Sequence, residues 1–234
     1  MFNLPPRLEM VAKMTRENKI LCDVGTDHAY LPVYLLQRGR IPYAYAGDIN
    51  EGPLKNAEQT AKKYGFTEKI ELILGSGLVN FRENCAQDFV IAGMGGELIS
   101  KILNDSPWVR TVGNHFVFQP QSHAEDLRRY LTENGYEIQK ESVCKEGKHL
   151  YLAMEAIFCG KTQDELIPFG ISPDAWYYTG KLGASESKYK EEYLLYIKSR
   201  LSVRMDALRK AKKDEQTVLK LHNVIEYIDN LLNI

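Results

Sequence analysis

Short apolar segments alternate with longer helical patterns between residues 19 and 134. The apolar segments lie at residues 19–25, 42–48, 69–75, 88–94 and 115–120. Near-continuous apolar segments of this length are typical of strands that are covered on both faces. The intervening stretches, such as 51–64 and 124–134, carry helical spacing and end near Gly65 and Gly135. The pattern predicts an α/β fold with a parallel, doubly wound sheet.

The pattern changes after residue 135. Residues 136–158 have the composition of two strands joined by the turn Glu146-Gly147-Lys148, with no helix between them. Two strands joined by so short a turn must run antiparallel. A mostly parallel sheet closed by an antiparallel hairpin resembles the Rossmann-like methyltransferase architecture more than a dinucleotide-binding dehydrogenase domain.

The last third of the chain predicts a helical domain. Residues 160–186 hold four Gly and two Pro and resemble a linker with short helical pieces. Apolar residues with coiled-coil spacing follow in two stretches: Leu194, Ile197, Leu201, Met205 and Leu208, then Val218, Leu221, Ile225, Ile228 and Leu232. A polar turn at 212–216 predicts a coiled-coil hairpin, although one long helix or pairing between chains stays open. We therefore expect a Rossmann-like catalytic domain at 1–160 and a helical coiled-coil domain at 161–234.

Composition excludes several classes of protein. Hydrophobic residues make up 44% and charged residues 26%, as in ordinary globular proteins, and no apolar run is long enough to span a bilayer. The N-terminal sequence lacks the features of a signal peptide, so we expect a cytoplasmic protein. The cysteines are far apart and form no C-x-x-C pair, which favours free thiols and predicts no metal site.

Charge is distributed unevenly along the chain. Residues 181–220 contain eleven Lys or Arg against six Asp or Glu, whereas residues 1–180 contain nineteen against twenty-three. A basic C-terminal region on an acidic body favours a polyanionic partner, although a solvated, lysine-rich helix face would give the same count.

The segment Asp23-Val24-Gly25-Thr26-Asp27-His28-Ala29 follows the first predicted strand, where a Rossmann fold has its nucleotide-binding turn. A dinucleotide needs the pattern G-x-G-x-x-G there, because the second glycine lets the backbone approach the pyrophosphate. Asp27 occupies the position of that second glycine, and Asp23 lies two residues before the first. Two carboxylates repel a pyrophosphate and favour a cationic ligand such as S-adenosylmethionine. A capping Asp alone would not require two acids and a His.

Three further strand ends carry candidate ligand groups. Asp48 ends the second strand and can accept hydrogen bonds from ribose hydroxyls. Gly75-Ser76-Gly77 ends the third strand, where the glycines permit close backbone approach and Ser76 can reach an adenine amine. Ala92-Gly93-Met94-Gly95-Gly96 ends the fourth strand and leaves room for a flat ligand. The Asn/Asp-Pro-Pro-aromatic motif of enzymes that methylate exocyclic amines is absent, which favours another acceptor, such as a ring nitrogen.

Six motifs together resemble the TrmK family of bacterial tRNA methyltransferases, which act on N1 of adenosine 22. They are DVGTDHAYLP (23–32), GDINEGPL (47–54), GSGL (75–78), IAGMGGELI (91–99), QPQSH (119–123) and EGKHLY (146–151). Ser76 and Gln121 depart from the Asp and Asn that are common in the family. The resemblance implies that S-adenosylmethionine is held by Asp23, Gly25, Asp27, His28, Ala29, Asp48, Ile49, Asn50, Gly75, Ser76, Gly77, Ala92, Gly93, Met94 and Gly95.

Methylation at N1 leaves the adenine cationic, so a nearby carboxylate would stabilise the developing charge. We expect Asp27 and His28 to be catalytic and the substrate to contact Arg7, Tyr30, Gln119, Pro120, His123, Lys148 and Tyr151. An extruded adenine would stack on an aromatic residue, for which Tyr30, Phe118, His123 and Tyr151 are candidates.

The basic helices would grip tRNA, with stacking from Tyr177, Tyr178, Tyr189, Tyr193 and Tyr196. We expect a monomer or a weak homodimer. A methyltransferase acting on another RNA, a protein or a small molecule stays open, as do a nicotinamide-dependent dehydrogenase and a non-enzymatic coiled-coil protein.

Overall fold

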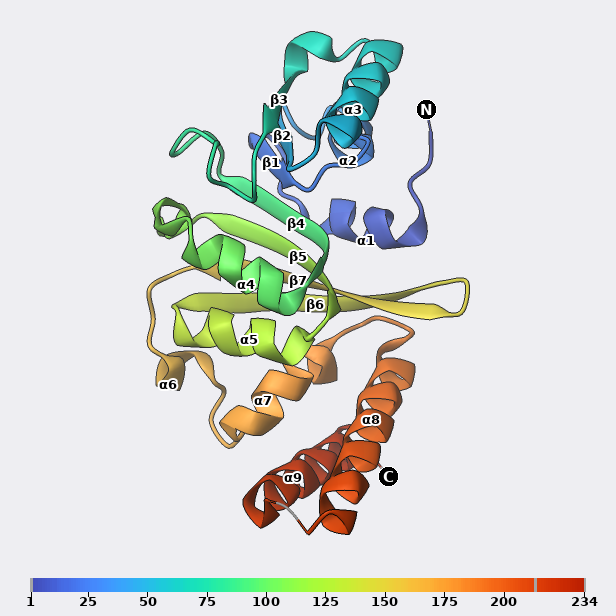
Figure 1. The fold of residues 1–234 in the computed structure, drawn as a ribbon, viewed down its shortest axis with the longest axis vertical. Helices are drawn as coiled ribbons and strands as arrows, with labels where there is room; N and C mark the ends of the chain where they lie inside the picture. Colours follow the sequence, from blue (N-terminus) through green and yellow to red (C-terminus); the bar gives the residue numbers. More distant parts are fainter. Residues whose placement is uncertain (1, 213, 234) are drawn as a thin grey trace.

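The computed structural model describes residues 2–212 and 214–233, and Figure 1 shows a central sheet with the C-terminal helices at one end. The sheet has seven strands in the order β3-β2-β1-β4-β5-β7-β6. Its parallel strands are β1 (Leu21–Val24), β2 (Ala44–Asp48), β3 (Ile70–Leu74), β4 (Asp88–Gly95) and β5 (His115–Ser122). The antiparallel hairpin of β6 (Tyr136–Glu146) and β7 (His149–Phe158) joins the sheet through β5. The predicted fold class is confirmed.

Successive residues of the central strands are buried on opposite faces of the sheet. Phe89 and Ile91 of β4 lie in one hydrophobic cluster, and Val90 between them lies in the other. In the same way β5 sends Phe116 to the first cluster and Val117 to the second. Because side chains alternate along a strand, burial on both faces requires apolar residues at consecutive positions, which explains the near-continuous apolar segments.

Helices cover both faces. The cluster that contains Val90 is covered by α1 (Pro6–Met14) and α2 (Tyr30–Gln37), and Ala61 of α3 (Glu51–Tyr64) joins it. On the other face lie α4 (Gly96–Asn104) and α5 (Ala124–Glu133). Single 3₁₀ turns η1, η2 and η3 lie at Thr67–Lys69, Pro107–Val109 and Leu182–Ala184. Helices α3 and α5 lie close to their predicted ranges, whereas α1 was not predicted from the sequence.

The glycine-rich segment after β7 is packed onto the sheet domain. It contains α6 (Gln163–Leu166) and α7 (Pro173–Thr179). Trp176 of α7 is buried, and its Nε1 donates a hydrogen bond to Thr132 Oγ1 of α5 at 3.0 Å. One continuous hydrophobic cluster runs from Phe116 of the sheet through Trp176 to Leu194 of the next helix. The segment is therefore part of the core.

The last two helices, α8 (Lys190–Lys210) and α9 (Glu215–Leu232), pair with each other within the chain (Figure 1). The Asp214 carboxylate caps α9 by accepting a hydrogen bond from the Thr217 backbone N–H at 3.0 Å. Both Lys212 and Asp214 have positive φ angles, which turn the chain without a glycine. The predicted hairpin is confirmed, and the alternative of one long helix is wrong.

The four cysteines are free thiols. Across residues 2–212 and 214–233, no helix combines the length and the apolar character needed to cross a membrane.

Candidate active site

Asp23 lies at the carboxyl end of β1, almost entirely buried. Its Oδ2 accepts a hydrogen bond from Thr26 Oγ1 at 2.6 Å. Burial raises the pKa of Asp23 to about 6, Thr26 opposes this shift, and the nearby Asp48 carboxylate adds to it. A carboxylate that is removed from water with one hydrogen-bond donor gains from any cationic group that binds beside it. The structure thus gives Asp23 the electrostatic character of a cation-binding group.

The loop after Asp23 has a strained backbone. Gly25, Asp27 and Ala29 all have positive φ angles, of 79°, 48° and 52°. A positive φ is costly for alanine, which has neither the freedom of glycine nor the polar side chain of aspartate. The loop is anchored to β2 by hydrogen bonds from the backbone N–H groups of Gly25 and Thr26 to the Gly47 carbonyl, at 2.8 and 3.0 Å. Strain that is maintained by anchoring contacts is typical of ligand-binding loops.

Asp27, His28 and Tyr30 lie together at the end of this loop. His28 Nε2 is 3.6 Å from Asp27 Oδ1, and the rings of His28 and Tyr30 are stacked with centroids 4.9 Å apart. Asp27 is well exposed and His28 is about one-third exposed. The proposed catalytic pair therefore presents a carboxylate and an imidazole to an incoming ligand.

Asp48 and the two residues after it form a turn at the end of β2. Asp48 Oδ1 accepts a hydrogen bond from the Asn50 backbone N–H at 2.9 Å, which leaves Oδ2 with no partner in the described part of the chain. Ile49 is a large hydrophobic residue with 62% of its surface exposed. An exposed apolar side chain beside a carboxylate is suited to the face of a base next to its ribose.

The end of β3 is fixed by a residue that the sequence analysis did not single out. Asn80 Nδ2 donates to the Leu74 carbonyl at 2.7 Å and lies over Gly75, where a β-carbon would come within 2.8 Å of it. Ser76 is exposed. Gly75 therefore allows Asn80 to approach closely. In the sequence, the glycine was the only signal of this contact.

The segment Ala92–Gly95 interrupts the regular pairing of β4 with β5. The register shifts on both sides of Met94, and Gly93 has a φ of 80°. The Met94 side chain reaches β1, since a β-carbon on Gly25 would lie 2.4 Å from Met94 Cε. The bulge thus brings the β4 segment over the β1 loop, and all the predicted cofactor-binding segments lie at the carboxyl ends of β1 to β4.

Gln119 is a buried carboxamide at the end of β5, next to Ala92 in the sheet. Its Nε2 donates to the Pro120 carbonyl at 3.1 Å, while its Oε1 has no donor among the residues that the structure describes. A buried amide oxygen without a partner costs free energy unless a ligand supplies a hydrogen bond. Gln119 is therefore a candidate acceptor for an amine of the substrate.

A cavity of about 510 Å³ lies between the sheet domain and α8, and its lining includes Pro120 but not Gln119. Four of the predicted substrate-binding residues line it: Pro120, His123, Lys148 and Tyr151. Arg7 lies outside this lining, with its guanidinium 5.5 Å from the Tyr151 ring centroid and its backbone N–H bonded to Glu146. Tyr30 lies elsewhere, in a smaller cavity of about 310 Å³ with Phe2 and Tyr64.

Phe118 does not lie at a binding surface. Its side chain is fully buried and stacks on Phe116 in the core, with ring centroids 5.6 Å apart. The expectation that it could hold an extruded base is wrong, because residue 118 points to the helix-covered face of β5 rather than beyond the strand end.

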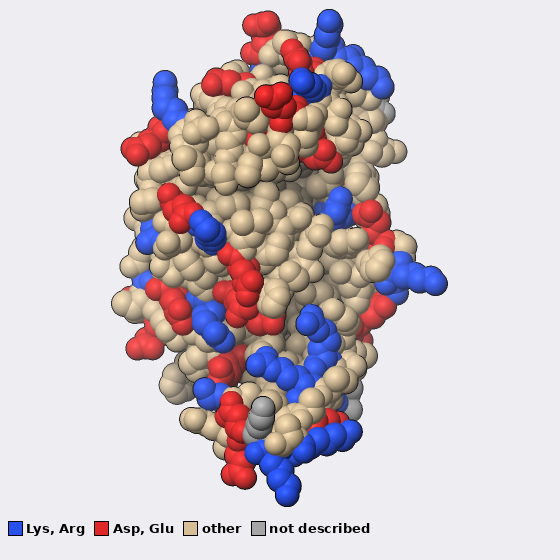
Figure 2. Space-filling view, viewed as in Figure 1, with Lys and Arg blue, Asp and Glu red and all other residues tan. Residues whose placement is uncertain are grey.

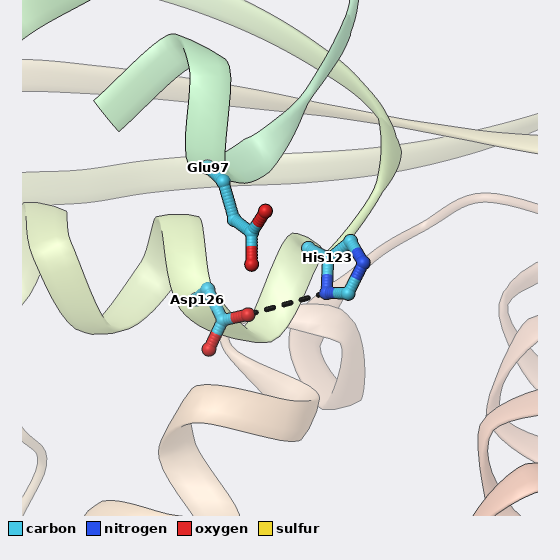
Figure 3. A group of neighbouring side chains, drawn as sticks. All are labelled: Glu97, His123 and Asp126. Atoms are coloured by element: carbon cyan, nitrogen blue, oxygen red, sulfur yellow. Dashed lines mark ion pairs between the residues drawn. The ribbon is translucent and has the colours of Figure 1, made fainter. Parts of the chain in front are cut away.

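His123 begins α5 beside two acids, as Figure 3 shows. Its Nδ1 lies 3.3 Å from Asp126 Oδ2, and the ligating groups of Glu97, His123 and Asp126 are all within 4.8 Å of one another. Gly96 permits this arrangement, because a β-carbon there would lie 2.1 Å from the His123 carbonyl oxygen. The cluster positions the His123 imidazole at the cavity edge, and the absence of a metal cofactor stays a prediction.

Residues 4–154 match the family model described as "Methyltransferase domain". The chain belongs to the methyltransferase family. A relative by sequence is the tRNA (adenine(22)-N(1))-methyltransferase of Bacillus subtilis, which is 33% identical over 153 residues. This match covers 65% of the present chain and 64% of that methyltransferase, which is a little under two thirds of its length.

Solved methyltransferase structures match nearly the whole chain. The B. subtilis m1A22 tRNA methyltransferase TrmK has a TM-score of 0.84 and 27% identity, with 100% of this chain and 99% of that chain covered. TrmK from M. capricolum, solved with the cofactor product S-adenosylhomocysteine, has a TM-score of 0.78 and 27% identity, covering 97% and 98%. This methyltransferase is therefore of the TrmK type, as its motifs suggested.

Proposed function

We propose that this methyltransferase transfers a methyl group from S-adenosylmethionine to N1 of an adenosine in tRNA, at position 22 by its likeness to TrmK. The observation that carries the proposal is the buried Asp23 carboxylate, held with Asp48 and the Asp27-His28 pair at the ends of adjacent strands. A TrmK structure solved with S-adenosylhomocysteine supports this choice of cofactor. A tRNA substrate implies action in the cytoplasm.

The residues present fit S-adenosylmethionine. Asp23 would accept a hydrogen bond from the cofactor's ammonium group, and the positive charge of that group would offset the desolvation of the carboxylate. Asp48, whose Oδ2 is free of partners within the described residues, would bind the ribose hydroxyls, and Ile49 would lie against the adenine. Gly25 and Gly93 would let the backbone approach the amino-acid portion of S-adenosylmethionine, once the Met94 side chain moves from its place over Gly25.

The same strand ends would orient the acceptor base. S-adenosylmethionine supplies an electrophilic methyl group on a sulfonium. Adenine N1 already carries a lone pair, so its attack needs no prior deprotonation, and the positive charge passes from sulfur to the methylated base. Gln119 Oε1 would accept a hydrogen bond from the exocyclic amine and turn N1 toward the cofactor site. Asp27 would stabilise the charge that develops on the base, with His28 holding the carboxylate in place.

The C-terminal helices would bind the RNA backbone. Figure 2 shows Lys and Arg side chains gathered over the end of the molecule where α8 and α9 lie. The exposed cations of α8 that line the cavity against the sheet domain are Arg200 and Arg204. Their attraction for phosphates would position the tRNA without reading its sequence.

Methyl transfer to unmodified tRNA tests the proposal directly. The enzyme is incubated with total tRNA and S-adenosylmethionine, and the nucleosides are analysed by mass spectrometry before and after. We expect 1-methyladenosine to appear, and to be absent when the substrate is a transcript that carries guanosine in place of the target adenosine. Methylation of a protein or small-molecule fraction, with none in tRNA, would favour the alternative acceptor classes.

A further inference from the structure

One face of α8 forms a wall of the 510 Å³ cavity. The α8 residues that line it recur at helical spacing, at Tyr193, Tyr196, Ile197, Arg200, Leu201 and Arg204. The opposite walls come from the start of α5 and from the tip of the β6–β7 hairpin, around Lys148. Asp23, Gly25 and Met94 do not line the cavity. The cavity is therefore distinct from the loop after β1, and it adjoins the end of β4 where Pro120 pairs with Met94 and Ser122 pairs with Gly95.

Arg128 lines this cavity from α5 and is 1% exposed. Its Nε donates to Glu141 Oε1 at 2.8 Å, and its Nη1 donates to the carbonyls of Tyr177 and Tyr178, each at 3.0 Å. Its Nη2 finds no acceptor among residues 2–212 and 214–233. A guanidinium carries two N–H groups on each terminal nitrogen, so two donors of a buried cation are left unsatisfied. Such donors favour a ligand that brings a strong acceptor.

Two further arginines face the cavity from α8. Arg200 lies over the Tyr196 ring, 5.8 Å from its centroid, and Arg204 Nη1 donates to Tyr178 Oη at 3.3 Å. Neither has a carboxylate within ion-pair distance in the described part of the chain. Together with Lys148, these two arginines outnumber Glu125, the one acid among the described residues that line the cavity, while the charge of Arg128 is balanced by Glu141. The lining therefore favours an anion.

Aromatic rings share the cavity with these cations. Tyr178, Tyr193 and Tyr196 line it on the α8 side, and Tyr151 lines it from the hairpin. Tyr196 is half-exposed, so part of its ring is accessible to a ligand. Planar rings beside arginines match the two parts of a nucleotide, a stacking base and an anionic phosphate.

We infer that the cavity between α5, the hairpin tip and α8 is a subsite for an RNA nucleotide that flanks the methylated one. Its phosphodiester accepts hydrogen bonds from Arg128 Nη2 and from Arg200 and Arg204, and its base stacks on Tyr196. The inference rests on the proposed function and deepens it, since it names the side chains that fix the acceptor strand next to the cofactor.

Paired charge variants on α8 test the subsite. R200Q/R204Q removes two cavity arginines, whereas R209Q/K210Q removes two charges from the last turn of the same helix, outside the cavity. In the enzyme saturated with S-adenosylhomocysteine, we expect the cavity variant to raise the Kd for tRNA at least 30-fold and the control variant to raise it less than threefold. Equal losses in the two variants would overturn the subsite, because they would show a diffuse electrostatic attraction.

Two substitutions of Tyr196, one of which keeps an aromatic ring, test the stacking of the base. Y196A should raise the KM for tRNA about tenfold with kcat nearly unchanged, and Y196F should restore it within twofold, because a phenyl ring stacks as a phenol does. Equal KM values for all three forms would overturn base stacking at this residue. R128K keeps a cation opposite Glu141 but removes both terminal nitrogens, Nη1 toward the Tyr177 and Tyr178 carbonyls and Nη2 toward the cavity. Measured below the melting transition of the variant, its tRNA affinity should fall at least fivefold, and an unchanged affinity would overturn the role of Nη2.

The proposed function and the nucleotide subsite are contradicted by different results. If wild-type enzyme forms no methylated nucleoside in tRNA, the proposed function fails. If wild-type enzyme methylates tRNA and the cavity variants match the R209Q/K210Q control, only the nucleotide subsite is wrong.

Discussion

The guanidinium of Arg128 and the carboxylate of Glu141 form a fully buried ion pair between α5 and β6, 2.8 Å apart. The pair also binds the C-terminal segment, because Glu141 Oε2 accepts a hydrogen bond from the Lys181 backbone N–H at 2.6 Å. Arg128 holds the Tyr177 and Tyr178 carbonyls from the other side. The sheet domain and the helical region are therefore joined through one buried polar network, and a chain ending near residue 160 would lose part of it.

Removing the Glu141 charge should destabilise the protein strongly. E141Q leaves the buried Arg128 without its counter-charge, which typically costs about 3–5 kcal/mol of unfolding free energy. The matched control is E137Q on the same strand. The Glu137 carboxylate pairs with Lys161 at the surface, so its removal should lower the unfolding free energy by less than about 1 kcal/mol. Urea denaturation measures both. Similar midpoints for E141Q and wild type would contradict a stabilising role for the network.

Replacing Asp23 by Asn should separate stability from cofactor binding. The folded pKa of Asp23 is about 6, above the ordinary 3.8, so the unliganded protein loses stability as pH rises from 3.8 to 6. The shift corresponds to roughly 3 kcal/mol. We expect unliganded D23N to melt at a higher temperature than wild type at pH 7.5, yet to bind S-adenosylmethionine at least tenfold more weakly by calorimetry. Unchanged cofactor affinity would show that Asp23 is not the ammonium acceptor.

Asp27 should contribute to turnover more than to cofactor binding. With both substrates saturating, D27N should lower kcat about 10²-fold, because the charge that stabilises the methylated base is lost. The Kd for S-adenosylmethionine should change less than fivefold, since Asp27 is exposed at the loop end. A kcat of D27N close to that of the wild type would show that Asp27 takes no part in the chemical step.

Binding of tRNA should weaken steeply as salt rises. Each phosphate that is neutralised contributes roughly −0.7 to −0.9 to the slope of log K against log salt concentration. Filter binding between 50 and 300 mM KCl should give a steep slope for wild type and a slope shallower by about 1 to 2 for R200Q/R204Q. A flat salt dependence would be incompatible with backbone recognition by α8.

His115 should make stability depend on pH near neutrality. Burial lowers the pKa of His115, but Asp88 and Glu155 outweigh it and raise the pKa above 6.5. Its Nδ1 is 3.3 Å from Asp88 Oδ2, and its Nε2 is 3.1 Å from Glu155 Oε1. The stabilisation is complete below pH 6.5 and is lost as pH rises through the folded pKa. Thermal melts of H115Q should lack this decline; an identical decline in H115Q would assign it to another group.

The amino-acid sequence by itself determined the sheet and the cofactor motifs. Apolar segments such as 88–94 identify strands because burial on both faces requires consecutive apolar residues. The acids at positions 23, 27 and 48 were predictable as neighbours, because parallel strands bring their carboxyl ends to one edge. These features follow from local periodicity and from a topology with few alternatives.

Only the tertiary structure decided the rest. Arg128 and Glu141 have the sequence context of surface residues on an amphipathic helix and a mixed strand, and their burial depends on α7, which comes much later in the chain. The tyrosines of α8 are alike in sequence and both line the cavity, yet Tyr193 is packed against the core whereas Tyr196 is half-exposed. Long-range packing makes these distinctions, because the environment of a charge or a ring depends on which distant segment covers it.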